Sequence, residues 1–265
     1  MANAGQSAAP DLRQRRKPRA RCRRGGKNCG SATTIYLHHG VPRARADRIE
    51  ALGASICWIA GTYDHAVDAA VEAARVDGIL VPDTSADVAD PIVRDVIAGY
   101  ATITSEIRAQ FMADGITISH QFVQAGVGGL AAAMAQGLPE AKLAIVEPEQ
   151  AACVAPALAA GRVVRIEGSL HTCAEMLACG EASAPALDIL RQYNPIPVLV
   201  SEAELLAAAD IMRDEADIRT TPSGSAGLAG LLHVANDGAL RQQAGIDRSS
   251  PDPSGRNGSA SRCHY

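Results

Sequence analysis

Short apolar runs alternate with amphipathic stretches from residue 33 to about residue 246. Runs rich in Val, Ile and Leu that are bounded by Gly, Pro or Asp are typical of buried strands, and apolar residues on one face of a 3.6-residue period indicate helices. The pattern predicts strands at 33–37, 55–59, 79–81, 118–124, 143–146, 162–167 and 196–200. It predicts helices at 43–52, 63–74, 92–110, 129–136, 149–159, 172–180, 184–193, 202–215 and 223–235. This alternation favours an α/β protein with parallel sheets covered on both faces.

Charge and polarity set the ends of the chain apart from this alternating region. Residues 1–30 hold seven Arg and two Lys against a single acid, Asp11, and residues 249–265 are rich in Ser, Gly and Pro. Both are predicted to be disordered tails. A transit peptide and a nucleic-acid-binding arm are alternatives for the basic tail, although it has neither an amphipathic helix nor interspersed aromatic residues. Between the tails we predict a small α/β domain at 31–113 and part of a larger domain at 114–248.

Composition narrows the function class only slightly. With 47% hydrophobic and 20% charged residues the chain is typical of a soluble globular protein, and its 3% aromatic content predicts a core of Ala, Val, Leu and Ile. The net charge of −4 gives no reason to expect a nucleic-acid partner, and no apolar run is long enough to predict a membrane span. The seven cysteines include no CxxC pair, which favours reduced thiols, no metal site and a cytoplasmic location.

A glycine-rich turn is the first candidate for chemistry. It joins the predicted strand ending near Gln124 to the predicted helix at 129–136, and it contains Gly126, Val127, Gly128, Gly129 and Leu130. Glycines allow a tight turn and close approach of an anion, and the first N–H groups of the helix lack intrahelical acceptors. The turn therefore predicts a phosphate site. A plain connecting turn and a Rossmann-type nucleotide site are the alternatives, the latter lacking the GxGxxG spacing and a ribose-binding acid.

A second motif lies far downstream, at Thr221–Gly230. It begins Thr-Pro-Ser-Gly and places the Ser223 hydroxyl at the start of the predicted last helix. One interpretation is that Ser223 contacts the same ligand as the glycine turn. The alternative is that Ser223 only caps the helix, because Pro-Ser-Gly is also a good capping sequence.

Several motifs occur along the chain in an order that resembles a known family. They are Ala32–Leu37, Ile49–Ala54, Gly61–Val67, Val81–Ser85, Ile97–Tyr100, Val123–Gly129, Ile145–Pro148 and Ala178–Glu181. Together they resemble the tryptophan-synthase-β-like (fold type II) pyridoxal-phosphate-dependent enzymes, and among these most of all the diaminopropionate ammonia-lyases. The resemblance covers residues 33 to about 246 and implies a two-domain, three-layer fold with parallel sheets, of which this chain holds an incomplete part.

The resemblance also implies roles for particular residues. It places the phosphate of pyridoxal 5'-phosphate in the turn Gly126–Leu130 and the cofactor's pyridine nitrogen against Ser223, whose hydroxyl suits a neutral ring. It makes Asp83 the base that handles the substrate α-proton, although an Asp before Thr-Ser is also a common turn residue. The roles of Glu147 and Glu181 stay open: each carboxylate could support the site or be solvated. His38 and His39 receive no role.

One element of the family is not found. Catalysis requires a lysine that joins the cofactor as a Schiff base, and the three lysines present are Lys17, Lys27 and Lys142. None has the expected sequence context, and the substrate-carboxylate loop is missing too, which suggests a chain shortened at its N-terminal end. The loss of strands there would leave an apolar sheet edge open, which predicts poor solubility or self-association, with a homodimer as one state.

The sequence thus predicts a pyridoxal-phosphate-dependent ammonia-lyase by descent. Its reaction would be a β-elimination that gives pyruvate and ammonia from 2,3-diaminopropionate. Because the Schiff-base lysine is not found, we expect the chain to be inactive or fragmentary. A serine or threonine dehydratase, with a hydroxy amino acid as substrate, and a non-catalytic remnant that still binds the cofactor are the alternatives.

Overall fold

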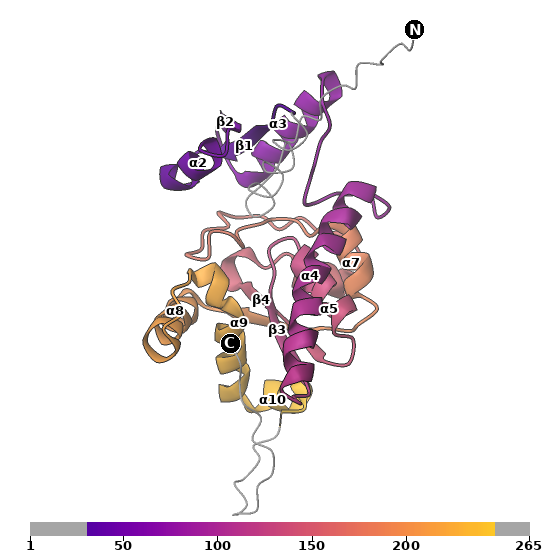
Figure 1. The fold of residues 1–265 in the computed structure, drawn as a ribbon, viewed down its shortest axis with the longest axis vertical. Helices are drawn as coiled ribbons and strands as arrows, with labels where there is room; N and C mark the ends of the chain where they lie inside the picture. The colour runs from indigo at the N-terminus through magenta and orange to yellow at the C-terminus, as the bar shows by residue number, and fades with distance from the viewer. Residues whose placement is uncertain (1–30, 247–265) are drawn as a thin grey trace, which may run out of the picture.

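The computed structural model describes residues 31–246, and the two predicted tails lie outside this range. The chain forms two separate sheets, and every strand pair in them is parallel (Figure 1). The smaller sheet pairs β1 (Thr34–His38) with β2 (Ser55–Ile59). The larger sheet has the order β3-β4-β5, formed by β3 (His120–Gln124), β4 (Lys142–Pro148) and β5 (Ile196–Val200). The fold is therefore α/β as predicted, while the domain limits at residues 113 and 114 stay a prediction.

The smaller sheet and α2 (Arg43–Glu50) form a compact apolar core, and α3 (Tyr63–Val76) also contacts both strands. The residues of this core are Ile35, Leu37, Val41, Ala46, Ile49 and Ala54. Thr62 precedes α3, and its backbone N–H donates to Nδ1 of His65 at 3.1 Å while its hydroxyl lies 2.9 Å from the same nitrogen. Thr62 therefore holds the N-cap position of this helix.

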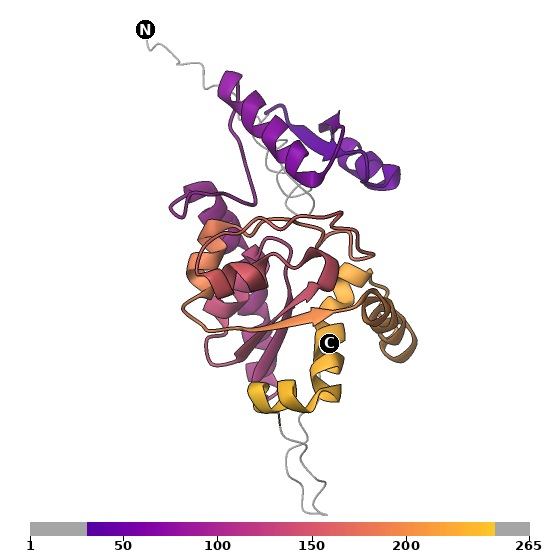
Figure 2. The same cartoon turned by 180° about the vertical axis from the view of Figure 1, so that it is seen from behind.

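The larger sheet is covered on both faces. One face carries α4 (Pro91–Ala113), α5 (Gly129–Gly137) and α7 (Ala184–Leu190), and the other carries α8 (Glu202–Ala216) and α9 (Pro222–Asn236) (Figures 1 and 2). Five consecutive alanine-rich positions of α5, residues 131–135, are buried, so the small side chains let this helix lie close to its neighbours. Alternate residues of β4 belong to two different cores, which explains why the strand is almost continuously apolar.

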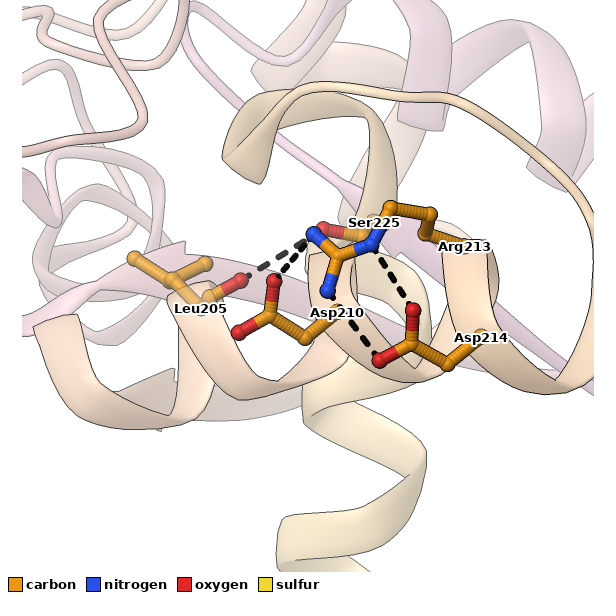
Figure 3. Close-up of polar contacts among 5 residues, drawn as sticks. All are labelled: Leu205, Asp210, Arg213, Asp214 and Ser225. Atoms are coloured by element: carbon orange, nitrogen blue, oxygen red, sulfur yellow. Dashed lines mark hydrogen bonds and ion pairs between the residues drawn. The ribbon is translucent and has the colours of Figure 1, made fainter.

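Helices α8 and α9 pack against each other along the second face. The hydroxyl of Ser225 on α9 donates to the backbone oxygen of Leu205 on α8 at 3.5 Å (Figure 3). On the exposed side of α8, Arg213 forms ion pairs with Asp210 and Asp214 at 2.6 and 2.8 Å (Figure 3). Because these three side chains are solvated, the ion pairs contribute little to stability. The hydrogen bond of Ser225 is the buried polar contact between the two helices.

The structure differs from the predicted elements in several places. Residues 79–81 are reduced to a single bridge residue, Leu80, and Ile79 is 46% exposed. The predicted strand 162–167 is reduced to one bridge between Arg165 and Glu181. The predicted helix 149–159 is divided into η1 (Glu149–Ala151) and α6 (Val154–Ala160), and α10 (Gly238–Ala244) was not predicted. A strand needs a neighbour for its N–H and C=O groups, and apolar residues alone do not supply one.

The predicted helix at 172–180 is an irregular segment for a different reason. Side chains take the backbone N–H groups that a helix would use: Glu202 accepts from Cys173 at 2.6 Å, and Ser223 accepts from Met176 at 3.1 Å. Residues 161–183 run across the end of the larger sheet that faces the smaller sheet (Figures 1 and 2). Tertiary hydrogen bonds thus replace the local helix and bring this segment beside the glycine turn.

None of the helices among residues 31–246 has the length and apolar character needed to cross a membrane.

Candidate functional site

A small cavity lies where β3 ends and the glycine turn begins. Its volume is about 80 Å³, and an adjoining cavity of about 370 Å³ shares Asp83 with it. The smaller cavity is lined by Tyr63, Asp83, Val96, Tyr100, Gln124, Ala125, Gly126, Val127, Gly128, Gly129, Leu130, Met176, Leu177 and Cys179. Ligands of α/β proteins bind at the carboxyl ends of parallel strands, so this is the expected place for a site.

The glycine turn has its carbonyl groups occupied and its N–H groups open. The oxygen of Gly126 accepts from the Cys153 thiol at 3.1 Å, and that of Val127 accepts from the Ser183 N–H at 2.9 Å. The oxygen of Gly128 accepts from an N–H inside α5 at 2.9 Å. By contrast, the N–H groups of residues 126–131 have no acceptor within residues 31–246. The turn therefore presents donors to the cavity, as an anion site requires.

Two glycines of the turn are required by its shape. Gly128 is the N-cap of α5 and has φ +95°, a left-handed conformation that other residues rarely adopt. A Cβ on Gly126 would lie 3.2 Å from Sγ of Cys179 and 3.3 Å from the backbone oxygen of Met176. The turn is thus held closely against the irregular 172–180 segment, and α5 directs the positive end of its dipole toward the cavity.

Ser223 lies in the first turn of α9 and is 1% exposed. Its oxygen accepts the N–H of Met176, which leaves its hydroxyl hydrogen without an acceptor among the described residues. The helix is capped by Thr221, whose side chain accepts from the Gly224 N–H at 3.3 Å. The interpretation of Ser223 as a plain cap is therefore wrong, and its side chain is not part of the lining of either cavity.

Asp83 lies in the loop before α4 and is half-buried. The Tyr63 hydroxyl donates to its carboxylate at 3.5 Å. Two residues farther along, the oxygen of Ser85 accepts from the N–H of Ala184 at 2.8 Å, one residue after Ser183 binds the glycine turn. These contacts place Asp83 and the turn in the wall of one cavity, although 43 positions separate Asp83 from Gly126 in the sequence.

Glu147 is a buried acid next to the glycine turn, and the sequence did not decide whether it supports the site or is solvated. It is 0% exposed, and its carboxylate accepts the N–H groups of Cys153, Val154 and Ala155 at 2.8, 2.7 and 2.8 Å. Burial raises the pKa of Glu147 to about 7, against the three N–H groups, which lower it. The solvated interpretation is therefore wrong for Glu147. Glu181 lines the larger cavity instead.

Tyr63 and Tyr100 were missed as site residues because each fits the apolar face of a helix. The signal that would have found them is their place in the two motifs Gly61–Val67 and Ile97–Tyr100, which lie on different helices.

Lys142 is the only lysine among residues 31–246, and it does not line the cavity. It begins β4, whereas the glycine turn follows the opposite end of the neighbouring parallel strand β3. Its Nζ donates to the backbone oxygen of Ala244 at 3.0 Å, at the end of α10. Within residues 31–246, therefore, the cavity wall contains donors and a carboxylate but no amine.

Comparison with known proteins gives a consistent assignment. Residues 24–246 match a family model described as "Pyridoxal-phosphate dependent enzyme". Diaminopropionate ammonia-lyase of Escherichia coli K12 is 31% identical over 169 residues, which cover 61% of this chain and 42% of that protein. The biosynthetic L-threonine dehydratase of Haemophilus influenzae is 29% identical over 210 residues, covering 77% of this chain and 39% of that protein. The chain thus spans about two fifths of the length of these relatives.

Solved structures share the fold. Diaminopropionate ammonia lyase from Escherichia coli matches with a TM-score of 0.78 at 22% identity, over 90% of this chain and 65% of that one. Serine racemase from maize matches with a TM-score of 0.76 at 17% identity, over 91% of this chain and 72% of that one. These matches confirm the predicted architecture of parallel sheets of the tryptophan-synthase-β-like type.

Proposed function

Because the chain belongs to the pyridoxal-phosphate dependent enzyme family, we propose that its cavity binds pyridoxal 5'-phosphate through the turn Gly126–Leu130. The observation that carries this proposal is that the N–H groups of residues 126–131 have no acceptor within residues 31–246, whereas the carbonyl groups of the turn accept hydrogen bonds from the protein. A phosphate group needs several converging donors and a helix N-terminus, and α5 supplies both. The cavity of about 80 Å³ is of a size for the phosphate group.

Two further residues would act on the rest of the bound molecule. The Ser223 hydroxyl has its hydrogen free to donate to the pyridine nitrogen, which would keep that ring neutral. The Asp83 carboxylate, in contact with the Tyr63 hydroxyl, would accept the proton from the substrate α-carbon. When bound, pyridoxal 5'-phosphate supplies the electron sink for loss of that proton.

We propose an ammonia-lyase ancestry for the site, with 2,3-diaminopropionate as the substrate and pyruvate and ammonia as the products. The support is the match of 169 residues to diaminopropionate ammonia-lyase at 31% identity. A serine or threonine dehydratase is the alternative, supported by the longer match at 29% identity. In both cases Asp83 would handle the α-proton, and the leaving group would differ: an amine in the first and a hydroxyl in the second.

A cofactor-binding protein without lyase activity is a second candidate function for the 265-residue chain. The specific observation in its favour is the place of Lys142 at the far end of the sheet, where its Nζ binds the oxygen of Ala244. We propose that this lysine forms no covalent link to the cofactor. Binding would then depend on the phosphate site and on Ser223.

Titration of the purified chain with pyridoxal 5'-phosphate tests the phosphate site. We expect saturable binding, and Gly128→Ala should weaken it about tenfold or more, because the φ of +95° is strained for Ala and the turn must rearrange. Gly99→Ala is the matched control, since Gly99 lies in α4 with no atom within 4 Å of an added Cβ. Equal affinities in the two variants, or no binding by the unmodified chain, would contradict the proposal.

Borohydride reduction of the loaded protein tests the chemistry. Peptide mass spectrometry after reduction should find no stoichiometric adduct at Lys142. A single adduct at Lys17, Lys27 or Lys142 would show that one of these lysines joins the cofactor. The enzyme would then be tested for release of the 2-oxo acid, which is pyruvate from 2,3-diaminopropionate or serine and 2-oxobutanoate from threonine. Faster release from 2,3-diaminopropionate would favour the ammonia-lyase, and faster release from serine or threonine would favour the dehydratase.

A further inference from the structure

Glu147 is the last residue but one of β4, and its side chain binds the chain that follows the strand. Its Oε1 accepts from the N–H groups of Cys153 and Val154, and its Oε2 accepts from the N–H of Ala155. A single fully buried carboxylate therefore fixes three consecutive backbone groups. Each bond is charge-assisted when the acid is ionised, which makes it stronger than a bond between neutral groups.

The segment that Glu147 fixes lies directly behind the glycine turn. The Cys153 thiol donates to the oxygen of Gly126 at 3.1 Å. Cγ2 of Val154 stands 3.5 Å from the position that a Cβ of Gly128 would take. The two glycines that the turn needs thus rest on two neighbouring residues, and both of these residues donate an N–H to Glu147.

We propose that Glu147 is a positioning residue for the phosphate-binding turn: by holding residues 153–155, it sets the place of Gly126 and Gly128 and so the direction of the open N–H groups. The proposal rests on the proposed function for its ligand, pyridoxal 5'-phosphate. Its geometry is independent of that function, because the contacts that link Glu147 to the turn through Cys153 are present without a ligand.

Burying an acid is unfavourable, and here burial raises the pKa of Glu147 to about 7. An apolar side chain in its place would leave the N–H groups of residues 153–155 without this acceptor. The carboxylate therefore serves to hold these three N–H groups, and the turn depends on it through Cys153 and Val154.

The test compares binding of pyridoxal 5'-phosphate with binding of pyridoxal, which lacks the phosphate. Glu147→Gln keeps the shape but turns one oxygen into an NH2 group that cannot accept. We expect the Kd for pyridoxal 5'-phosphate to rise about tenfold, the equivalent of about one lost charge-assisted hydrogen bond, and the Kd for pyridoxal to stay unchanged. Glu149→Gln is the matched control, because Glu149 is an exposed acid two residues away.

Hydrogen exchange of the ligand-free protein gives a second measurement. Glu147→Gln should speed the exchange of the hydrogen-bonded N–H groups of α5, from Ala132 onward, but not of those in β1 or β2. Two milder variants cover the case in which Glu147→Gln fails to fold. Cys153→Ala should reproduce the faster exchange and part of the rise in Kd, and Cys153→Ser, which keeps a donor to Gly126, should restore both.

The outcomes separate the inference from the proposed function. If the unmodified chain does not bind pyridoxal 5'-phosphate, the proposed function fails, and the exchange of α5 from Ala132 onward alone decides the role of Glu147. If the variants weaken both ligands equally, or leave both the Kd values and the exchange unchanged, the positioning role is overturned. A loss confined to the phosphate-bearing ligand, with faster exchange at the start of α5, supports it.

Discussion

Glu147→Gln should change how the stability of the protein depends on pH. Burial raises the pKa of Glu147 from 4.5 to about 7. At about 1.4 kcal/mol for each pKa unit, the folded chain favours the protonated acid by about 3 kcal/mol relative to the unfolded chain. Because the folded pKa is the higher one, this stabilisation is fully present below pH 4.5, is lost as the pH rises to about 7, and stays lost above it. Gln does not titrate.

Urea unfolding of the parent and of Glu147→Gln, at pH values from 4.5 to 8, measures this effect. The other carboxylates are the same in both proteins, so their contributions cancel in the difference. The free energy of unfolding of the parent, minus that of the variant, should fall by about 3 kcal/mol over this range. For the exposed Glu149→Gln the same difference should stay level. A difference that rises with pH would refute the reasoning, since it would mean that the three N–H groups outweigh burial.

Substitutions at three other positions test the packing and capping. Gly99→Ala should stabilise the protein by about 1 kcal/mol, because this exposed residue lies inside α4 with open space around it. Gly227→Ala should destabilise it by about 1–3 kcal/mol, because the added Cβ would lie 2.7 Å from the backbone oxygen of Phe122; equal effects of these two substitutions on the unfolding midpoint would contradict the packing. Asp90→Ala should cost about 1 kcal/mol by removing the cap of α4, and Asp90→Asn, which keeps an acceptor oxygen, should cost less.

Local sequence was sufficient for most of the elements. The strands 55–59 and 196–200 have the predicted limits, and the helix from residue 202 ends within one residue of its prediction. In each of these the apolar period agrees with the packing, and for α8 the sequence contains its own start signal: Ser201 and Glu204 form a capping box, with Ser201 N–H to Glu204 Oε2 at 2.8 Å. Such elements need no information from distant residues.

Two of the failures share one cause. Residues 172–180 and 162–167 carry helix-like and strand-like patterns, but their backbone groups bond to side chains and loops that are distant in the sequence, as Met176 bonds to Ser223. In α10 a short local signal was present, since Asp237 accepts the N–H groups of Ala239 and Leu240 at 2.8 and 2.9 Å. A helix of seven residues spans only about two turns, so its apolar pattern is too brief to be recognised, and the cap was the available signal.

For the candidate site, the sequence by itself determined the residue types: glycines that permit the turn, a hydroxyl at Ser223 and a carboxylate at Asp83. The glycines follow from conformational freedom, which is a local property, whereas the roles of Ser223 and Asp83 follow from the resemblance to the enzyme family. Only the tertiary structure decided that the turn has its carbonyl groups occupied and its N–H groups open, and that Glu147 is buried behind it. Both depend on Cys153, Ser183 and their neighbours, which the chain brings to the turn only by folding. Burial and hydrogen-bond partners are properties of that packing, and they convert a glycine-rich connection into a candidate phosphate site.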